Sequence, residues 1–240
     1  MPSFPATTLN APAKLTLSLR VTGVRDDGYH LIDAEMVSLD FHDRIEVAPG
    51  DGLRVVGAHG TETVGPDVDN LARRALALAG RTADVTLHKN IPAGAGLGGG
   101  SSDAAAILRW AGFTDLAAAA RLGADIAYCL VGGRARVRGV GEIVDPLPFV
   151  PQTLTLVTPP VFCATPEVYR VWDELGGPVG SHGNDLEPAA LTVAPELARW
   201  RDELGAATGE QPRLAGSGST WFVEGAFPDA GRVVTTIPAP

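Results

Sequence analysis

The stretch ADVTLHKNIPAGAGLGGGSSDAAAILRWAG, residues 83–112, decides the fold of this chain. Its opening ADVTLHK predicts a strand, and its closing DAAAILRWAG predicts an alanine-rich helix that begins at about Ser102. Five glycines between Gly94 and Gly100 leave backbone N–H groups free to converge on phosphate oxygens, and the helix adds the positive end of its dipole. The order strand, glycine loop, helix therefore predicts a phosphate-binding loop, in which Ser101 or Ser102 can offer a hydroxyl to a phosphate-bound magnesium ion.

Other glycine-loop folds fit this stretch less well. Gly94, Gly96 and Gly99 satisfy the GxGxxG pattern of dinucleotide-binding folds. A Rossmann unit also needs an acidic residue at the end of a second parallel strand about 20 residues later, and that distance falls in helical sequence here. The Walker pattern requires a lysine directly after the glycines, and none follows. Taken alone, the loop also fits a simple turn between a strand and a closely packed helix.

The composition describes a globular chain. Its 240 residues exceed the usual size of one compact domain, which favours two domains. Hydrophobic residues make up 45% and charged residues 20%, which is ordinary for a protein with a packed core. The net charge of -9 argues against nucleic acid as a general partner, because phosphate backbones are bound by clustered Lys and Arg. An anionic substrate therefore needs a local positive site.

Several features favour a cytoplasmic protein without a membrane partner. Cys129 and Cys163 are too few for a disulfide scaffold and too far apart for a metal-ligand spacing. Residues 1–14 lack a basic segment followed by an apolar run, so we expect no secretory signal. The apolar stretch 116–131 is interrupted by charged residues and is too short to span a bilayer. We expect the protein to act as a monomer or a homodimer on a small-molecule substrate.

The opening third of the chain predicts a meander of strands. In KLTLSLRV, residues 14–21, strict alternation puts Lys14 on one strand face and four apolar residues on the other: Leu15, Leu17, Leu19 and Val21. The segment RDDGYH (25–30) predicts a turn. Further strand-like runs lie at residues 34–39, 44–47 and 53–56.

Helix caps and proline content indicate the middle of the chain and a domain boundary. Capping residues precede two apolar runs: Asp69 or Asn70 at the first, and Thr114 or Asp115 at the second. Residues 132–144 indicate a hairpin, and the proline-rich DPLPFVPQ (145–152) is the best linker candidate. We therefore predict an N-terminal domain of residues 1–148 and a C-terminal domain of residues 149–240.

The C-terminal part begins with a strand at TLTLV, residues 153–157. A helix follows in which Thr165 is the expected N-cap and Pro166 takes the first helical position. Another helix is expected at about residues 195–206, followed by a second glycine-serine loop, LAGSGST (214–220).

Two residues outside the glycine loop are candidates for catalysis. Only Lys14 and Lys89 among the 19 basic residues are lysines, which indicates a need for a compact ammonium group. Taken singly, Lys14 also fits a solvent-exposed strand residue, and Asp125 fits the N-cap of a short helix. Four histidines show no metal-ligand spacing, so we predict no protein metal site: His42, His59, His88 and His182.

Seven segments, in order and over nearly the whole chain, resemble the GHMP kinase superfamily. They are PAKLTLSL (12–19), RDDGYHL (25–31), IPAGAGLGGGSSDAA (91–105), GADIAYCLVGG (123–133), GVGE (139–142), NDLEPA (184–189) and AGSGST (215–220). The GYH triplet, the doubled glycines before Ser-Ser and the GAD segment narrow the resemblance to the kinases of 4-diphosphocytidyl-2-C-methyl-D-erythritol, in the non-mevalonate isoprenoid pathway.

The resemblance implies an α+β, two-domain GHMP kinase fold. Its N-terminal domain resembles the second domain of ribosomal protein S5, its C-terminal domain is ferredoxin-like, and the active site lies between them. The implied reaction transfers the γ-phosphoryl group of ATP, with Mg2+, to a hydroxyl of the cytidine-diphosphate-linked methylerythritol.

The resemblance also implies roles for individual residues. Lys14 and Asp125 match the family's catalytic pair. The ATP loop matches Pro92, Ala93, Gly94, Ala95, Gly96, Leu97, Gly98, Gly99, Gly100, Ser101 and Ser102. Tyr29 and Tyr169 match the aromatic residues that stack on the cytosine, although Tyr169 also fits the core of its helix. His30 matches the position that reads the base edge, and Thr165 matches a polar contact nearby.

The chain departs from the family pattern at several points. Thr16, which should face the substrate beside Lys14, stands where the family has asparagine, and Ala127 replaces a proline. The chain is also shorter around residues 60–68 and after Trp110. Three alternatives stay open: a GHMP kinase for mevalonate, homoserine or a sugar, which has no use for GYH; a catalytically weak nucleotide-binding relative; and an NAD-dependent enzyme.

Overall fold

The structure, a computed structural model, describes residues 4–57 and 69–240. His59 and the shortened segment at 60–68 lie outside these residues. The strands are β1 (Thr7–Val24), β2 (His30–Ala48), β3 (Leu53–Gly57), β4 (Asp84–Lys89), β5 (Arg134–Gly139), β6 (Ile143–Pro146), β7 (Thr153–Val157), β8 (Arg213–Leu214), β9 (Trp221–Glu224) and β10 (Arg232–Ile237). The helices are α1 (Leu71–Leu78), α2 (Gly99–Trp110), α3 (Leu116–Leu122), α4 (Ile126–Val131), α5 (Thr165–Glu174), α6 (Glu187–Val193) and α7 (Leu197–Thr208).

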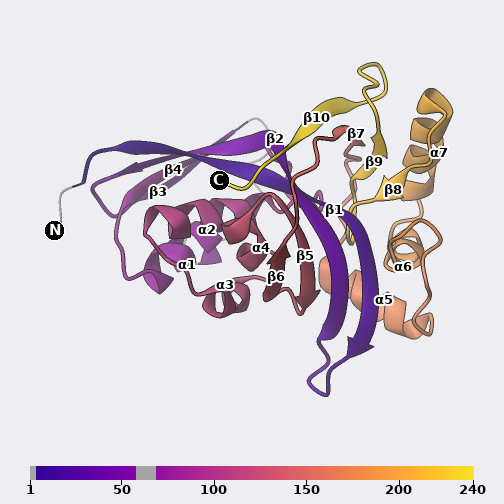
Figure 1. Cartoon of the computed structure of the whole chain (residues 1–240), viewed down its shortest axis with the longest axis horizontal. Helices are drawn as coiled ribbons and strands as arrows, with labels where there is room; N and C mark the ends of the chain where they lie inside the picture. Colours follow the sequence, from indigo (N-terminus) through magenta and orange to yellow (C-terminus); the bar gives the residue numbers. More distant parts are fainter. Residues whose placement is uncertain (1–3, 58–68) are drawn as a thin grey trace.

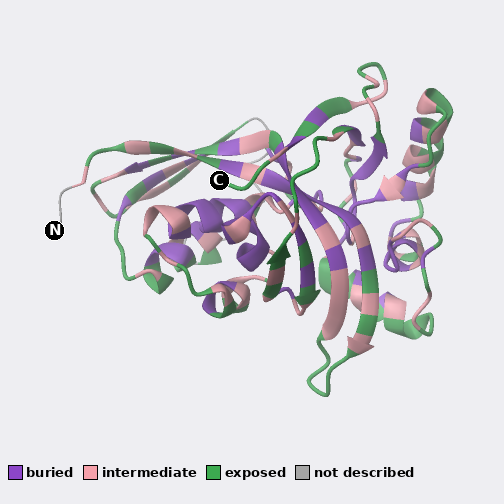
Figure 2. Ribbon diagram, viewed as in Figure 1, coloured by how far each residue is buried: buried purple, intermediate pink, exposed green. Residues whose placement is uncertain are grey.

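The described strands join into one sheet, in the order β3-β4-β2-β10-β7-β9-β8, with β1 and β5 also paired to β2 and β6 paired to β5. Helices α1 to α4 gather beside the β1–β2 part of the sheet, and α5 to α7 lie with the C-terminal strands (Figure 1). The central helix α2 is buried along most of its length (Figure 2). No described helix is long and apolar enough to cross a membrane.

The predicted meander is wrong in its strand pairing. β2 is one continuous strand of 19 residues that covers both runs expected at 34–39 and 44–47. β3 does not pair with β2; it pairs in parallel with β4, which lies between them. The connection through α1 permits this parallel arrangement, because parallel neighbours need a crossover, and strand-like sequence alone does not choose a neighbour.

Register shifts in β1 overturn the expectation of one apolar face. The pairing of β1 with β2 shifts between Thr16 and Ser18, among other places. Leu15 and Leu17 therefore pack in a small core cluster with Leu154 and other residues, whereas Leu19 packs in the main core cluster. A bulge adds one residue to a strand and moves the following side chains to the opposite face.

Local capping signals agree with the structure at two helices and fail at two others. Side chains of Asn70 and Asp115 accept hydrogen bonds from the first turns of α1 and α3. α2 begins at Gly99, earlier than the expected Ser102, because Gly98 serves as its N-cap in the left-handed conformation. The N-cap of α5 is Ala164, so Thr165 is already helical and the expected Thr165 cap is wrong. Helix α6 was not expected from the sequence.

The C-terminal strand connects the two parts of the chain. β10 pairs with β7 from Arg232↔Leu156 to Thr235↔Thr153, and it then continues along β2 through Thr236↔Leu39 and Ile237↔Ser38. The expected hairpin forms from β5 and β6, and residues 147–152 contain no helix or strand. A domain boundary at 148/149 stays a prediction.

Candidate active site

Lys14 and Asp125 form an ion pair at the point where β1 meets the start of α4. Lys14 Nζ lies 3.2 Å from Asp125 Oδ2, with side-chain exposures of 8% and 33%. Lys14 is therefore not the solvent-exposed strand residue that it could have been. Asp125 is the N-cap residue of α4, as the alternative expected, but its side chain makes no capping hydrogen bond to the helix, so the carboxylate is not used for capping. The pair joins a buried cation to a carboxylate that solvent and ligands can reach.

Lys14 also contacts the glycine loop. Its backbone N–H donates to the carbonyl oxygen of Leu97 at 3.0 Å. A Cβ atom on Gly98 would lie only 2.6 Å from Lys14 Cγ, so the loop runs directly over the lysine stem. Lys14 Nζ also donates a hydrogen bond to Thr16 Oγ1 at 3.2 Å. The buried Thr16 hydroxyl thus helps to position the ammonium group. The sequence predicted only that Thr16 faces the substrate, where the family has asparagine.

The glycine loop has a backbone conformation that only glycine adopts easily. Gly94, Gly96 and Gly98 have φ values of +70°, +75° and +67°, in the left-handed region that side chains disfavour. Residues up to 98 form the loop, and the remaining predicted loop residues form the first turn of α2. The backbone of the loop is therefore held open at the positive end of a helix.

The two serines at the end of the loop have different surroundings. The Ser102 hydroxyl donates to the carbonyl oxygen of Pro12 at 2.5 Å, and its amide donates to Gly98 O at 2.8 Å. Ser102 is fully buried, whereas Ser101 is half-buried. Of the two candidates for a phosphate-bound magnesium ion, Ser101 has the more available hydroxyl.

The second glycine-serine loop packs against the first. A Cβ atom on Gly96 would lie 2.5 Å from the carbonyl oxygen of Gly218 and 2.9 Å from that of Ala215. The Thr220 hydroxyl donates to the carbonyl oxygen of Ala95 at 2.7 Å. The close approach of the two backbones at Gly96 leaves no room for a side chain.

We expect Gly96→Ala to weaken both the fold and ATP binding. The left-handed backbone costs alanine about 1–2 kcal/mol, and the clash with two carbonyl oxygens adds to this. Gly80→Ala is the matched control, because Gly80 has φ +62° with nothing within 4 Å of its Cβ position. Urea unfolding should show a larger loss for Gly96→Ala, and its KM for ATP should rise about tenfold. Equal behaviour of the two variants would contradict the packing of the loops.

Aromatic side chains of β2 and α5 meet beside the Lys14–Asp125 ion pair. The rings of His30 and Tyr169 have centroids 4.6 Å apart, and His30 Nε2 lies 2.9 Å from Asp173 Oδ1. Burial and the nearby charge of Asp125 raise the pKa of Tyr169. Tyr169 therefore lies where α5 faces both His30 and Asp125. Tyr29 is 64% exposed in the β1–β2 turn, and no described aromatic ring stacks on it.

Thr165 and two polar residues to which the sequence assigned no role, Ser217 and Asn184, make the hydrogen bonds of this region. Thr165 Oγ1 lies 2.9 Å from Ser217 Oγ, which joins α5 to the second glycine-serine loop. Asn184 is buried and donates to the carbonyl oxygens of Leu214 and Gly216 at 2.8 and 2.7 Å. The only signal for Asn184 was its place in the NDLEPA segment.

A buried ion cluster, Asp43–Lys89–Asp103, lies beneath the glycine loop. Lys89 Nζ donates to Asp43 Oδ2 and to Asp103 Oδ2. Asp43 and Asp103 are buried, and Asp103 Oδ1 has no hydrogen-bond partner. The rarity of lysine was the only sequence signal for this cluster, because the aspartates come from distant elements.

The ion cluster predicts a pH dependence of stability. Burial raises the pKa of Asp103 from 3.8 to about 7, against the opposing effect of Lys89. The folded protein therefore holds a proton that the unfolded chain releases, so this group lowers the free energy of unfolding as pH rises from about 4 to about 7. Asp103→Asn removes the titration, and we expect its unfolding midpoint in urea to fall less than that of the wild type between about pH 5 and about pH 7. Asp115→Asn is the control, and a slope unchanged by Asp103→Asn would contradict the prediction.

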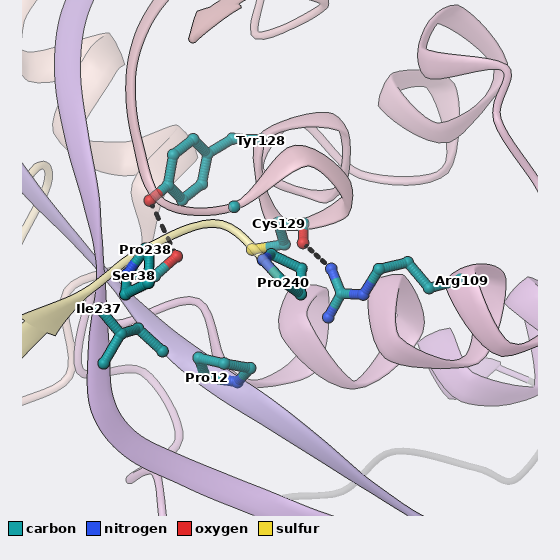
Figure 3. A pocket seen from close by; sticks show the side chains of 9 residues that line it. Pro12, Ser38, Arg109, Tyr128, Cys129, Ile237, Pro238 and Pro240 are labelled. Carbon is teal, nitrogen blue, oxygen red and sulfur yellow. Dashed lines mark hydrogen bonds between the residues drawn. The ribbon is translucent and has the colours of Figure 1, made fainter. Parts of the chain in front are cut away.

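No group of three or more His, Cys, Asp or Glu residues in the described part of the chain could hold a metal ion. A small cavity lies elsewhere, between β1, β2, α4 and the C-terminal residues, and none of its lining residues belongs to the predicted site (Figure 3). Its polar groups pair with the protein: Tyr128 donates to Gly133 O at 2.6 Å, and Arg109 donates to Cys129 O. We assign no ligand to this cavity.

The sequence of this chain is similar to a family model and to known proteins. Residues 68–133 match the family model of the GHMP kinases N-terminal domain. The 4-diphosphocytidyl-2-C-methyl-D-erythritol kinase of Paracoccus denitrificans is 40% identical, over 88% of this chain and 84% of that protein. The same-named protein of Cereibacter sphaeroides is 39% identical, over 88% and 87% of the two chains.

Solved structures extend the likeness to the whole fold. The crystal structure of a 4-(cytidine 5'-diphospho)-2C-methyl-D-erythritol kinase superimposes with a TM-score of 0.77 and 32% identity, over 98% of this chain and 100% of that one. A homoserine kinase from Cytophaga hutchinsonii has a TM-score of 0.63 and 17% identity, over 100% and 97% of the two chains, and shows the fold alone. The expected α+β GHMP kinase fold is confirmed.

Proposed function

The chain belongs to the GHMP kinases, in the family of 4-diphosphocytidyl-2-C-methyl-D-erythritol kinases, and we propose that Lys14, Asp125 and the glycine loop carry out its phosphoryl transfer. As a member of this family it is an ATP-dependent kinase that phosphorylates a hydroxyl of 4-diphosphocytidyl-2-C-methyl-D-erythritol in the non-mevalonate isoprenoid pathway. The observation that carries the assignment of residues is the 3.2 Å ion pair directly beneath the loop.

In the proposed reaction, the acceptor hydroxyl oxygen attacks the γ-phosphorus of ATP, the bond to the bridging oxygen of the β-phosphate breaks, and ADP leaves. Asp125 orients the hydroxyl and receives its proton, which then passes to solvent. Lys14 stabilises the negative charge that spreads over the transferred group. Phosphoryl transfer depends mainly on positioning and charge stabilisation, which a buried, fixed ammonium group supplies.

The glycine loop is the proposed site for the triphosphate. The left-handed glycines turn the backbone so that its N–H groups can face an anion, and the N-terminus of α2 adds a positive dipole. The residues fit a Mg2+ ion that would be held mainly by phosphate oxygens, and the half-buried Ser101 hydroxyl would be its protein ligand. When bound, this ion neutralises phosphate charge.

The proposed acceptor site lies on the side of His30 and Tyr169. Two aromatic rings next to Asp125 suit a flat base, and Tyr29 on the exposed turn is free to add a second stacking surface. Thr165 is assigned a polar contact at the start of α5. Thr16 is assigned an indirect role, because its hydroxyl contacts the Lys14 ammonium group.

We further propose that the enzyme works in the cytoplasm, where Cys129 and Cys163 stay reduced. Both are buried and unpaired in the structure, and burial raises the pKa of the Cys129 thiol to about 12, so this thiol stays neutral. Cys129 therefore takes no part in the reaction as a nucleophile.

The test measures ADP release by the purified protein with Mg-ATP, with and without 4-diphosphocytidyl-2-C-methyl-D-erythritol. Substrate-dependent turnover that Lys14→Met abolishes supports the proposal. Mevalonate and homoserine serve as competing acceptors, and preferential turnover of either would assign the site to another alcohol. ATP binding without turnover of any acceptor would indicate a nucleotide-binding relative that has lost its activity.

A further inference from the structure

The ion cluster Asp43–Lys89–Asp103 joins the two ends of the glycine loop. Lys89 is the last residue of β4, directly before the loop, and Asp103 lies in α2, directly after it. One ammonium group contacts both Asp43 Oδ2 and Asp103 Oδ2. We propose that these three residues form an ionic clasp that holds the loop in its phosphate-binding shape, and that they are positioning residues for ATP.

Asp43 fixes the start of the loop as well as the lysine. Its Oδ1 accepts hydrogen bonds from the backbone N–H groups of Asn90 and Ile91, at 2.5 and 2.8 Å. A Cβ atom on Gly99, the first residue of α2, would lie 3.4 Å from Asp43 Oδ2. One carboxylate from β2 therefore binds the backbone at the start of the loop and lies close to the first residue of the helix. The backbone N–H groups at the start of the loop thus donate to Asp43, and we assign those nearer the helix to the phosphate groups of ATP.

The cluster is not explained by stability alone. Asp43 is 0% exposed and Asp103 is 2% exposed, yet the two carboxyl groups share one ammonium group. Apolar side chains of similar volume in such places are often as stable as a buried ion cluster, or more stable. Apolar contacts do not fix direction, however, whereas each hydrogen bond from the ammonium group to a carboxyl oxygen fixes both distance and angle. The clasp thus fixes the separation of the loop ends, although apolar side chains at these positions could give equal or greater stability.

The clasp controls the geometry of the loop. Removing the clasp should therefore weaken ATP binding more than it changes acceptor binding or turnover. We expect Lys89→Met to raise the Kd of Mg-ATP about tenfold or more, since small misplacements of positioning groups have large effects. The KM for the acceptor should stay within about twofold, and kcat at saturating ATP within about threefold. The Kd is measured by titration calorimetry without acceptor.

A destabilised control separates positioning from general loss of stability. Leu87→Ala, on the same strand as Lys89 and buried in the main core, should lower the unfolding midpoint without raising the Kd of ATP. Asp103→Asn keeps an oxygen that accepts from Lys89 and should retain ATP affinity within about twofold, whereas Asp103→Leu should lose about as much as Lys89→Met.

The comparison of Asp103→Leu with Asp103→Asn carries the test if Lys89→Met does not fold. An ATP affinity that falls no further in Lys89→Met and Asp103→Leu than in Leu87→Ala would overturn the clasp. The inference rests on the proposed function in one respect: that the glycine loop is the site that binds ATP. A wild-type protein that binds ATP but does not phosphorylate the acceptor would contradict the proposed function, while the ATP titrations would still decide the inference.

Discussion

Replacing Asp125 with asparagine lowers kcat by about a thousandfold, the range typical for loss of a general base in proton transfer. Asparagine has the same shape and can still accept a hydrogen bond from Lys14 Nζ, which lies 3.2 Å from the carboxylate in the wild type. It cannot take the proton of the acceptor hydroxyl. We therefore expect the KM for ATP to stay within about twofold while the chemical step slows, as measured by steady-state ADP release.

The control for this substitution is Asp115→Asn, which changes another helix-start aspartate. Asparagine caps a helix as well as aspartate does, so α3 should keep its cap and the enzyme its activity. Near-normal turnover by Asp125→Asn would remove the proton-acceptor role and leave Asp125 only as the partner of Lys14.

Lys14→Met is expected to lower kcat by about a hundredfold to a thousandfold, because no other described basic side chain is paired with Asp125. Methionine keeps the length of the stem that Gly98 covers, so packing changes little. The loss should fall on turnover rather than on ATP affinity. A pre-steady-state measurement of the first turnover tests this, since it reports the chemical step directly.

Two further variants sharpen the Lys14 prediction. Lys14→Arg should not restore activity, because a planar guanidinium is larger than an ammonium group and Gly98 leaves no spare room over the stem. The double variant Lys14→Met with Asp125→Asn should lose little more than the worse single variant, since the two groups act as a unit. Fully additive losses would show that the two residues act independently.

The sequence predicted those parts of the fold that depend on neighbouring residues. Asn70 and Asp115 cap the helices that their positions indicated, because a cap is a contact within one turn. The bulge near Thr16 and the parallel pairing of β3 with β4 were not predictable in this way. Both depend on which distant strand lies alongside, and alternating polarity does not encode the neighbour.

The candidate site was predictable in its residue types but not in its connections. Glycine spacing located the loop, and the scarcity of lysine drew attention to Lys14. The ion cluster was not predictable, because Asp43 and Lys89 are 46 residues apart in the sequence and only the fold brings them together. Thr165 was misassigned as a cap, since nothing local shows that its hydroxyl turns toward Ser217.

The place of β10 in the middle of the sheet also affects how the chain is made. Asp40 accepts hydrogen bonds from Thr235, 195 residues further along the chain. At a synthesis rate of about 5–20 residues per second, this part of β2 waits about 10–40 seconds for its partner strand. During that time the edge of β2 at Leu39 is open to other strands, so the nascent chain has a period of exposure to misassembly that ends only when β10 emerges.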